Sequence, residues 1–218
     1  KGAKLNVALY SPLSSDLRGI VFTCKEANVF DLYDPHLRNG LPNGSLIDTR
    51  GGLELRKQHY SIFWGAGSFF VEPTVRWGLI MRNGLAGNRM VLLGIDSSLE
   101  GGEIEKKMAG FDSALPENST GVSARDYFAL NQSRLAKTRA AGIISDTIDK
   151  ISEGSRKYLA ALGNAFTLDS GKEYMKQAGI ALANEVRVYY GVRQLMDDTM
   201  RAAIFLLLAL LPFAIFFE

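Results

Sequence analysis

Residues 170–217 read SGKEYMKQAGIALANEVRVYYGVRQLMDDTMRAAIFLLLALLPFAIFF. Ser170 and Glu173 open this stretch as a capping box, in which the serine side chain accepts the amide proton three residues on and the glutamate reaches back to the cap amide. No proline interrupts the stretch before Pro212. The sequence therefore predicts one helix that begins at Ser170 and continues into the apolar end of the chain.

The end of that helix, Ala202–Phe217, is an uninterrupted run of 16 uncharged and strongly apolar residues. Buried helices account for runs of about 10–14 residues, whereas a membrane span needs about 20, or about 17 at the short end. Thr199 and Met200 extend the run toward that length, and proline is tolerated in membrane helices because neighbouring groups satisfy the freed carbonyl. We therefore expect a transmembrane helix over 202–218, truncated at the end of the sequence.

Two stretches before the apolar run share a repeat of about 3.5 residues, which makes a narrow seam for one partner helix. Thr167–Asp169 lies between them and is short enough to join antiparallel neighbours. We predict a long antiparallel helical hairpin over 123–201 that packs on itself; the alternative is a stalk that also docks a second protein. The repeat consists of Ile144, Ile148, Ile151, Ser155, Tyr158, Leu162 and Ala165, and then of Met175, Ala178, Leu182, Val186, Tyr189, Val192, Met196 and Met200.

The first helix of this hairpin has to be interrupted. Ser123–Phe166 is longer than Ser170–Arg201, so an unbroken antiparallel partner would carry several arginines and a lysine alongside the apolar run. Glycine weakens a helix, and Ala140-Ala141-Gly142 is the weakest point. We predict a break there, with Ile143–Phe166 paired to the second helix and Ser123–Ala141 leaving the seam.

The first half of the chain alternates short apolar runs with Gly, Pro and Asn. Four to six residues rich in β-branched and aromatic side chains, punctuated in this way, indicate strands. Leu53–Phe63 fits a short helix or a strand, and Asn83-Gly84 suits a hairpin connection. We expect a small β-rich extramembrane domain over 1–96 and a linker or loop over 97–122, so the chain as a whole is α+β. The runs are Leu5–Tyr10, Ile20–Cys24, Asn28–Tyr33, Ser45–Asp48, Ser68–Val71, Arg76–Met81 and Arg89–Gly94.

Composition narrows the function classes. The 218 residues carry a formal charge of +2, too near zero to indicate a nucleic-acid surface. One cysteine, Cys24, excludes an internal disulfide and a multi-cysteine metal site, and two histidines are too few for most metal constellations. No hydrolase, nucleotide-binding or metalloprotease motif occurs. We expect no catalytic residues, no cofactor and no metal. Because the sequence begins at Lys1, we also expect a fragment or a processed product.

The densest polar stretch is Asp48–His59, followed by Glu72 and Arg76. Paired acidic and basic side chains of this kind could line a cleft for a ligand or a partner. A solvated rim or a salt-bridge network between loops is the commoner outcome, and the aromatic residues nearby suit a core as well as a binding platform. The candidate cleft residues are Arg50, Glu54, Arg56, His59, Trp64, Glu72, Arg76 and Trp77.

The long helix running from an extramembrane domain into a span, with the ending LLPFAIFFE, resembles the stalk and second transmembrane helix of FtsX-like permeases of ABC-type exporters. The resemblance covers about Ser170–Glu218. It implies an extracytoplasmic domain between the first two spans, a mechanical role, and a partner ATPase that binds the nucleotide itself.

These patterns together lead to one expected function and two alternatives. We expect a non-enzymatic segment of a permease, transport or cell-envelope complex at the bacterial inner membrane, with its domain outside the cytoplasm. Its expected partners are the lipid bilayer and the membrane and ATPase subunits of a transport complex, and not nucleic acid. The first alternative is a ligand-binding module held by a single C-terminal membrane anchor, with ligands taken by the Trp64–Trp77 region. The second is a membrane-anchored hydrolase that uses the Asp48–Arg76 polar residues.

Overall fold

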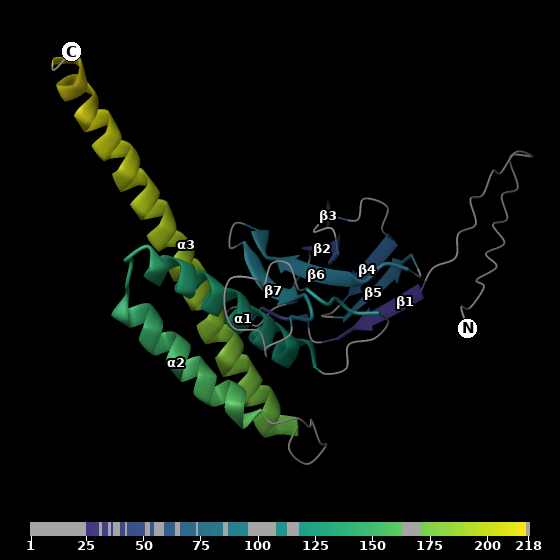
Figure 1. Cartoon of the computed structure of the whole chain (residues 1–218). Helices are drawn as coiled ribbons and strands as arrows, with labels where there is room; N and C mark the ends of the chain where they lie inside the picture. Colours follow the sequence, from purple (N-terminus) through teal and green to yellow (C-terminus); the bar gives the residue numbers. More distant parts are fainter. Residues whose placement is uncertain are drawn as a thin grey trace, which may run out of the picture. The chain divides into compact units, whose positions relative to one another are not determined.

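A computed structural model of the chain describes residues 25–30, 32–34, 36, 40–41, 43–50, 53–54, 59–63, 66–72, 74–84, 87–95, 108–112, 118–162 and 171–216. The chain divides into two compact units. Unit 1 comprises Lys1–Gly94 with Ala109–Ser119, and unit 2 comprises Ile95–Met108 with Thr120–Glu218. A small β-sheet region comes first and a long C-terminal helix ends the chain, which confirms the α+β class (Figure 1).

Unit 1 is built from antiparallel strands in two sheets, ordered β1-β5-β4 and β3-β2-β6-β7. The ambiguous stretch Leu53–Phe63 contributes β3 and β4, so it forms strands and no helix in its described part. The hairpin expected at Asn83-Gly84 joins β6 to β7, and Gly84 and Gly87 adopt the positive φ values that such a turn needs. The strands are β1 (Lys25–Val29), β2 (Asn43–Asp48), β3 (Leu53–Glu54), β4 (His59–Phe63), β5 (Ala66–Val71), β6 (Trp77–Arg82) and β7 (Asn88–Leu92).

The core of unit 1 gathers around Trp77. Side chains along β5 alternate between half-buried and buried, the pattern of a strand with one face on a core. Phe69 of β5 stacks on Trp77 with ring centroids 6.4 Å apart, and Phe111 covers another side at 5.2 Å. Trp77 is 0% exposed. The two sheets of unit 1 therefore share an aromatic core.

The described part of unit 2 contains three helices: α1 (Ser119–Ala140), α2 (Asp146–Ala161) and α3 (Gly171–Phe216). The break predicted at Ala140–Gly142 is confirmed, and its cause is a Schellman motif. Gly142 has φ +75°, its amide donates to Arg139 O at 2.9 Å, and the Ile143 amide donates to Thr138 O at 2.9 Å. Ser170, the predicted cap of the last helix, lies outside the described residues.

The pairing of the segment after the break with α3 is also confirmed. Leu162 of α2 packs with Tyr174 and Ala178 at one end of the pair. Near the other end, Ile148 and Ile151 of α2 lie against a cluster made by three buried residues, Leu135, Val188 and Val192. Leu135 belongs to α1, so the prediction that 123–141 leaves the seam is wrong: α1 also packs against α3 through its side chains.

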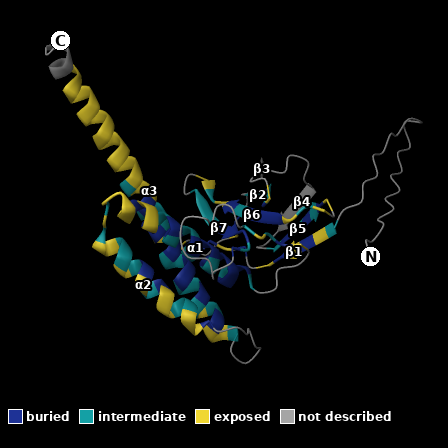
Figure 2. Ribbon diagram, in the orientation of Figure 1, coloured by how far each residue is buried: buried dark blue, intermediate teal, exposed yellow. Residues whose placement is uncertain are grey.

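The C-terminal part of α3 extends beyond the other two helices of unit 2, and every residue from Arg201 to Leu211 is exposed (Figure 2). No helix in the described part of the chain is both long enough and apolar enough to cross a membrane. The apolar part of α3 in the described residues, 202–216, covers about 22 Å of helix, against the roughly 30 Å of a bilayer core. The predicted transmembrane helix over 202–218 is therefore corrected, together with the assignment to membrane, transport and permease proteins that followed from it.

Candidate functional site

The structure describes six of the eight residues of the cleft predicted in the first half, and three of these six lie in strands of unit 1: Glu54, His59 and Trp77. Arg50, Glu72 and Arg76 are exposed, and Arg76 Nη1 donates to Ala109 O at 3.1 Å. Trp77 is buried in the aromatic core. The structure places Glu54 in β3 and His59 in β4, which belong to different sheets, and Arg56 and Trp64 lie outside the described residues. The cleft stays a prediction.

A buried polar contact ties α1 to α3. Asn131 and Glu185 are both 0% exposed, and the Asn131 amide nitrogen donates to Glu185 Oε2 at 2.7 Å and to Glu185 O at 2.8 Å. Burial raises the pKa of Glu185 from its ordinary value of 4.5 to about 7, against smaller opposing effects of Asn131 and Ser155. Among the described residues, neither Glu185 Oε1 nor Asn131 Oδ1 has a hydrogen-bond partner. This carboxyl group therefore loses its proton only as the pH rises through about 7, well above the pH at which an exposed glutamate ionises.

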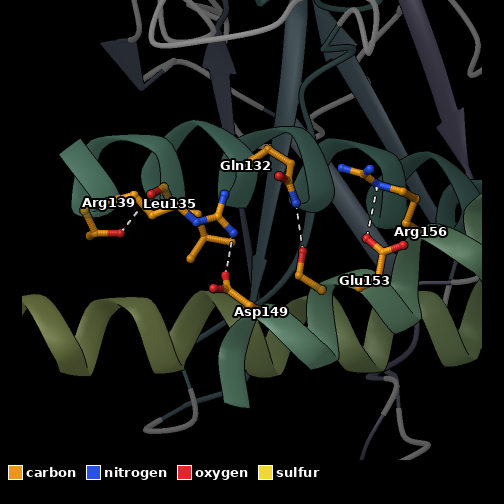
Figure 3. A network of polar contacts seen from close by, with 8 residues as sticks. Gln132, Leu135, Arg139, Asp149, Glu153 and Arg156 are labelled. Carbon is orange, nitrogen blue, oxygen red and sulfur yellow. Dashed lines mark hydrogen bonds and ion pairs between the residues drawn. The ribbon is translucent and has the colours of Figure 1, made fainter. Parts of the chain in front are cut away.

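Further polar contacts join α1 to α2 at the edge of the bundle (Figure 3). Gln132 of α1 donates to Ser152 Oγ at 2.8 Å, and Arg139 pairs with Asp149 at 2.5 Å across the turn between the helices. Both partners of the ion pair are partly exposed, so the pair contributes little to stability. These contacts set the register of the two helices and hold no reactive group.

A groove of about 560 Å³ opens within unit 2, between the C-terminal end of α1 and the middle of α3. Its walls combine cationic, aromatic and aliphatic side chains. The lining residues are Arg134, Lys137, Thr138, Ala141, Ile143, Tyr189, Arg193, Met196, Asp197, Thr199 and Met200.

One arginine of the groove is held in place by an aromatic ring. The Arg134 guanidinium lies over the Tyr189 ring, 4.6 Å from its centroid, which is the geometry of a cation–π contact. Tyr127 of α1 meets the same Tyr189 ring edge-on, with centroids 5.4 Å apart. The Tyr189 ring, which contacts both Tyr127 and Arg134, therefore positions the Arg134 guanidinium at the groove.

The groove leads into the exposed apolar end of α3. Met196 and Met200 line it and are 44% and 62% exposed. From Ala202 to Leu211 every residue is exposed, with Phe205 at 71% and Leu207 at 70%. The groove and this apolar end, residues 202–211, are two features of the described part of unit 2 that lie open to a ligand or a partner.

Sequence reasoning missed both the buried Glu185 and the groove. Glu185 stands one position before Val186 of the seam, and nothing local shows that it is buried. Arg134 and Lys137 are among the charges of the first helix that the sequence argument keeps away from the apolar run, and that argument assigns them no role in a site. The sequence does hold one signal for the groove, the spacing of its basic residues. Arg134 and Lys137 are three positions apart and so share one helix face.

Among the described residues, no three side chains of His, Cys, Asp or Glu gather closely enough to hold a metal ion. No protein-family model, curated protein or solved structure matches the chain. The resemblance to FtsX-like permeases has no support from these comparisons. The candidate site therefore rests on its own geometry.

Proposed function

We propose that this chain is a non-enzymatic interaction module of a larger protein complex, in which α3 presents the apolar end 202–211 to a partner protein. The observation that carries the proposal is the exposure of this segment. Phe205 and Leu207 are more than two-thirds exposed, and no charged residue occurs between Arg201 and Leu211. A helix that is apolar on all sides is ordinarily covered by other structure.

Burying the apolar side chains of residues 202–211 against a partner would be energetically favourable. Burying one leucine or phenylalanine side chain contributes about 1.5–3 kcal/mol. Several such side chains lie on successive turns of one helix, which is the arrangement that docks into an apolar groove of another protein. The large exposed residues of this end are Ile204, Phe205, Leu206, Leu207, Leu208, Leu210 and Leu211.

The way α3 is held supports presentation to a partner. The preceding part of the same continuous helix is anchored in the bundle through Leu182, Val186 and Val192, all buried. A helix fixed over several turns presents an exposed segment that continues it at lower entropic cost than a loose segment would. The bundle thus serves as the support and the apolar end as the docking element.

Site-specific photo-crosslinking in the native cell tests this proposal. A benzophenone amino acid replaces Leu207 in one variant of the full chain and the exposed Lys157 of α2 in a control variant. We expect a discrete adduct with another protein from position 207 and none from position 157. The charged variant Leu207→Glu should abolish association with that protein while leaving the melting temperature unchanged.

Three outcomes would overturn the proposal. Adducts formed only with lipid would assign the apolar end to a membrane surface. Adducts formed only with a second copy of the chain would make the end a self-association element. Equal labelling from positions 207 and 157 would show that the end has no specific partner.

A further inference from the structure

We infer that the groove between α1 and α3 binds a small, single-tailed anionic amphiphile, with a carboxylate or phosphate head group and an aliphatic tail. This inference is independent of the docking role proposed for residues 202–211, because the two features use different side chains. It rests on three properties of the groove: its positive charge, the presence of both a cationic and an apolar part in its walls, and its volume.

The charges of the groove favour an anion. Arg134, Lys137 and Arg193 line it, against the single acidic residue Asp197. Arg134 and Lys137 are one turn apart on α1, and Arg193 follows Tyr189 by one turn on α3, so cations from two helices face the same space. Arginine donates two hydrogen bonds in the fork that matches carboxylate and phosphate oxygens.

The partial negative charge at the C-terminal end of α1 does not strongly oppose the binding of an anion in the groove. The carbonyls of a helix C-terminus carry partial negative charge, which would repel an anionic head group. Here the Thr138 and Arg139 carbonyls accept hydrogen bonds from the Ile143 and Gly142 amides. The Schellman motif therefore satisfies the carbonyls nearest the groove.

The remaining walls suit an aliphatic tail. Ile143, Met196 and Met200 supply apolar surface on the side of the groove that leads along α3. Methionine is flexible and polarisable, so it adapts to chains of different length. These apolar residues and the cations line one continuous cavity. A site for a simple anion would need only the cations, whereas a site for an amphiphile needs both.

The size of the groove favours a small ligand. Its volume of about 560 Å³ lies within the roughly 300–1,000 Å³ of sites for small molecules. A nucleic acid would need a longer track of cations than three side chains on two helices supply. The inferred ligand is therefore a small molecule with one charged end.

Titration calorimetry with the full chain tests this inference, using dodecanoate and dodecyl phosphate below their micelle concentrations. Dodecanol and inorganic phosphate are the controls for tail alone and head alone. The matched variants are Arg193→Gln, which removes a cation of the groove, and Arg187→Gln, which removes an exposed cation of the same helix outside it. Both positions are exposed, so both variants should fold, and circular dichroism checks this.

We expect at least one of the two anionic amphiphiles to bind with 1:1 stoichiometry, and Arg193→Gln to raise its Kd by roughly tenfold. Arg187→Gln should leave that Kd unchanged. Preference for dodecanoate or for dodecyl phosphate then identifies the head group. Three results would overturn the inference: dodecanol binding as tightly as the anions, inorganic phosphate binding as tightly as the amphiphiles, or equal effects of the two substitutions.

Discussion

Asn131 of α1 donates to the Glu185 carboxylate of α3 at 2.7 Å, and neither side chain reaches solvent. Within the part of the chain that the structure describes, the second oxygen of the carboxylate and the amide oxygen of Asn131 are both acceptors without a hydrogen-bond partner. An ionised carboxylate in such a place is costly because burial removes its hydration and one amide replaces only part of it. A protonated carboxyl group avoids that cost. The stability of the helical unit therefore depends on whether Glu185 is protonated, and so on pH.

We predict that unfolding stability falls as pH rises from about 4.5 to about 7. Burial raises the pKa of Glu185 in the folded state to about 7, above its ordinary value of 4.5. The folded state therefore binds more protons than the unfolded chain between these values, and stability that is fully present below the lower value is lost as pH rises through the upper one. A shift of this size corresponds to about 3 kcal/mol.

The variant Glu185→Gln isolates this effect, because an amide of the same shape still accepts from Asn131. Urea denaturation at pH 5 and pH 8 should give nearly equal stabilities for the variant. At pH 8 the variant should be more stable than the parent chain by up to about 3 kcal/mol. A parent chain with the same free energy of unfolding at both pH values would contradict the assignment.

Asn131→Ala should destabilise the chain. The substitution removes both hydrogen bonds to Glu185 and leaves a buried carboxyl group unsatisfied, which costs about 1–3 kcal/mol. The loss should be larger at pH 8, where the carboxyl group is ionised, than at pH 5. Ser133→Ala is the matched control two residues away, because the buried Ser133 hydroxyl has no hydrogen-bond partner in the described residues. Equal losses for the two variants in urea titrations would argue against a specific role for Asn131.

Two glycines of unit 2 should respond to alanine in opposite directions. Gly142 has φ +75° in the turn that ends α1, and a Cβ there meets open space but a strained backbone. Gly142→Ala should therefore cost about 1–2 kcal/mol. Gly154 lies inside α2 with nothing within 4 Å of its added Cβ, so Gly154→Ala should stabilise by about 0.5–1 kcal/mol. Thermal denaturation of the two variants measures both signs, and a stabilising Gly142→Ala would contradict the Schellman motif.

Much of the fold was predictable because its determinants are local. A glycine placed where a helix had to stop predicted the turn at Gly142, and a 3.5-residue repeat predicted the face that α2 and α3 share as far as Val192. Glu185 was not predictable in this way. Its burial depends on Asn131 and Ser155, which come from two other helices, and a charged residue beside a seam ordinarily faces water.

The candidate site was unpredictable for a related reason. Arg134 and Arg193 are far apart in sequence and line one groove only because α1 packs against α3 near Leu135. The sequence predicts correctly that the apolar run after Arg201 continues the helix, but hydropathy alone does not identify what covers it. In the described part of that helix the run is too short to cross a membrane.

Two single leucine-to-alanine substitutions on α3 should have different effects on stability, one in the core of the bundle and one in the apolar end. Leu182 is 0% exposed and Leu207 is 70% exposed, although both lie on the same helix. Leu182→Ala leaves a cavity and should cost about 2–5 kcal/mol. Leu207→Ala should change stability by less than about 0.5 kcal/mol. Urea denaturation, at concentrations where sedimentation shows a monomer, measures both; a comparable loss at Leu207 would mean that the end packs against this chain and is not free for a partner.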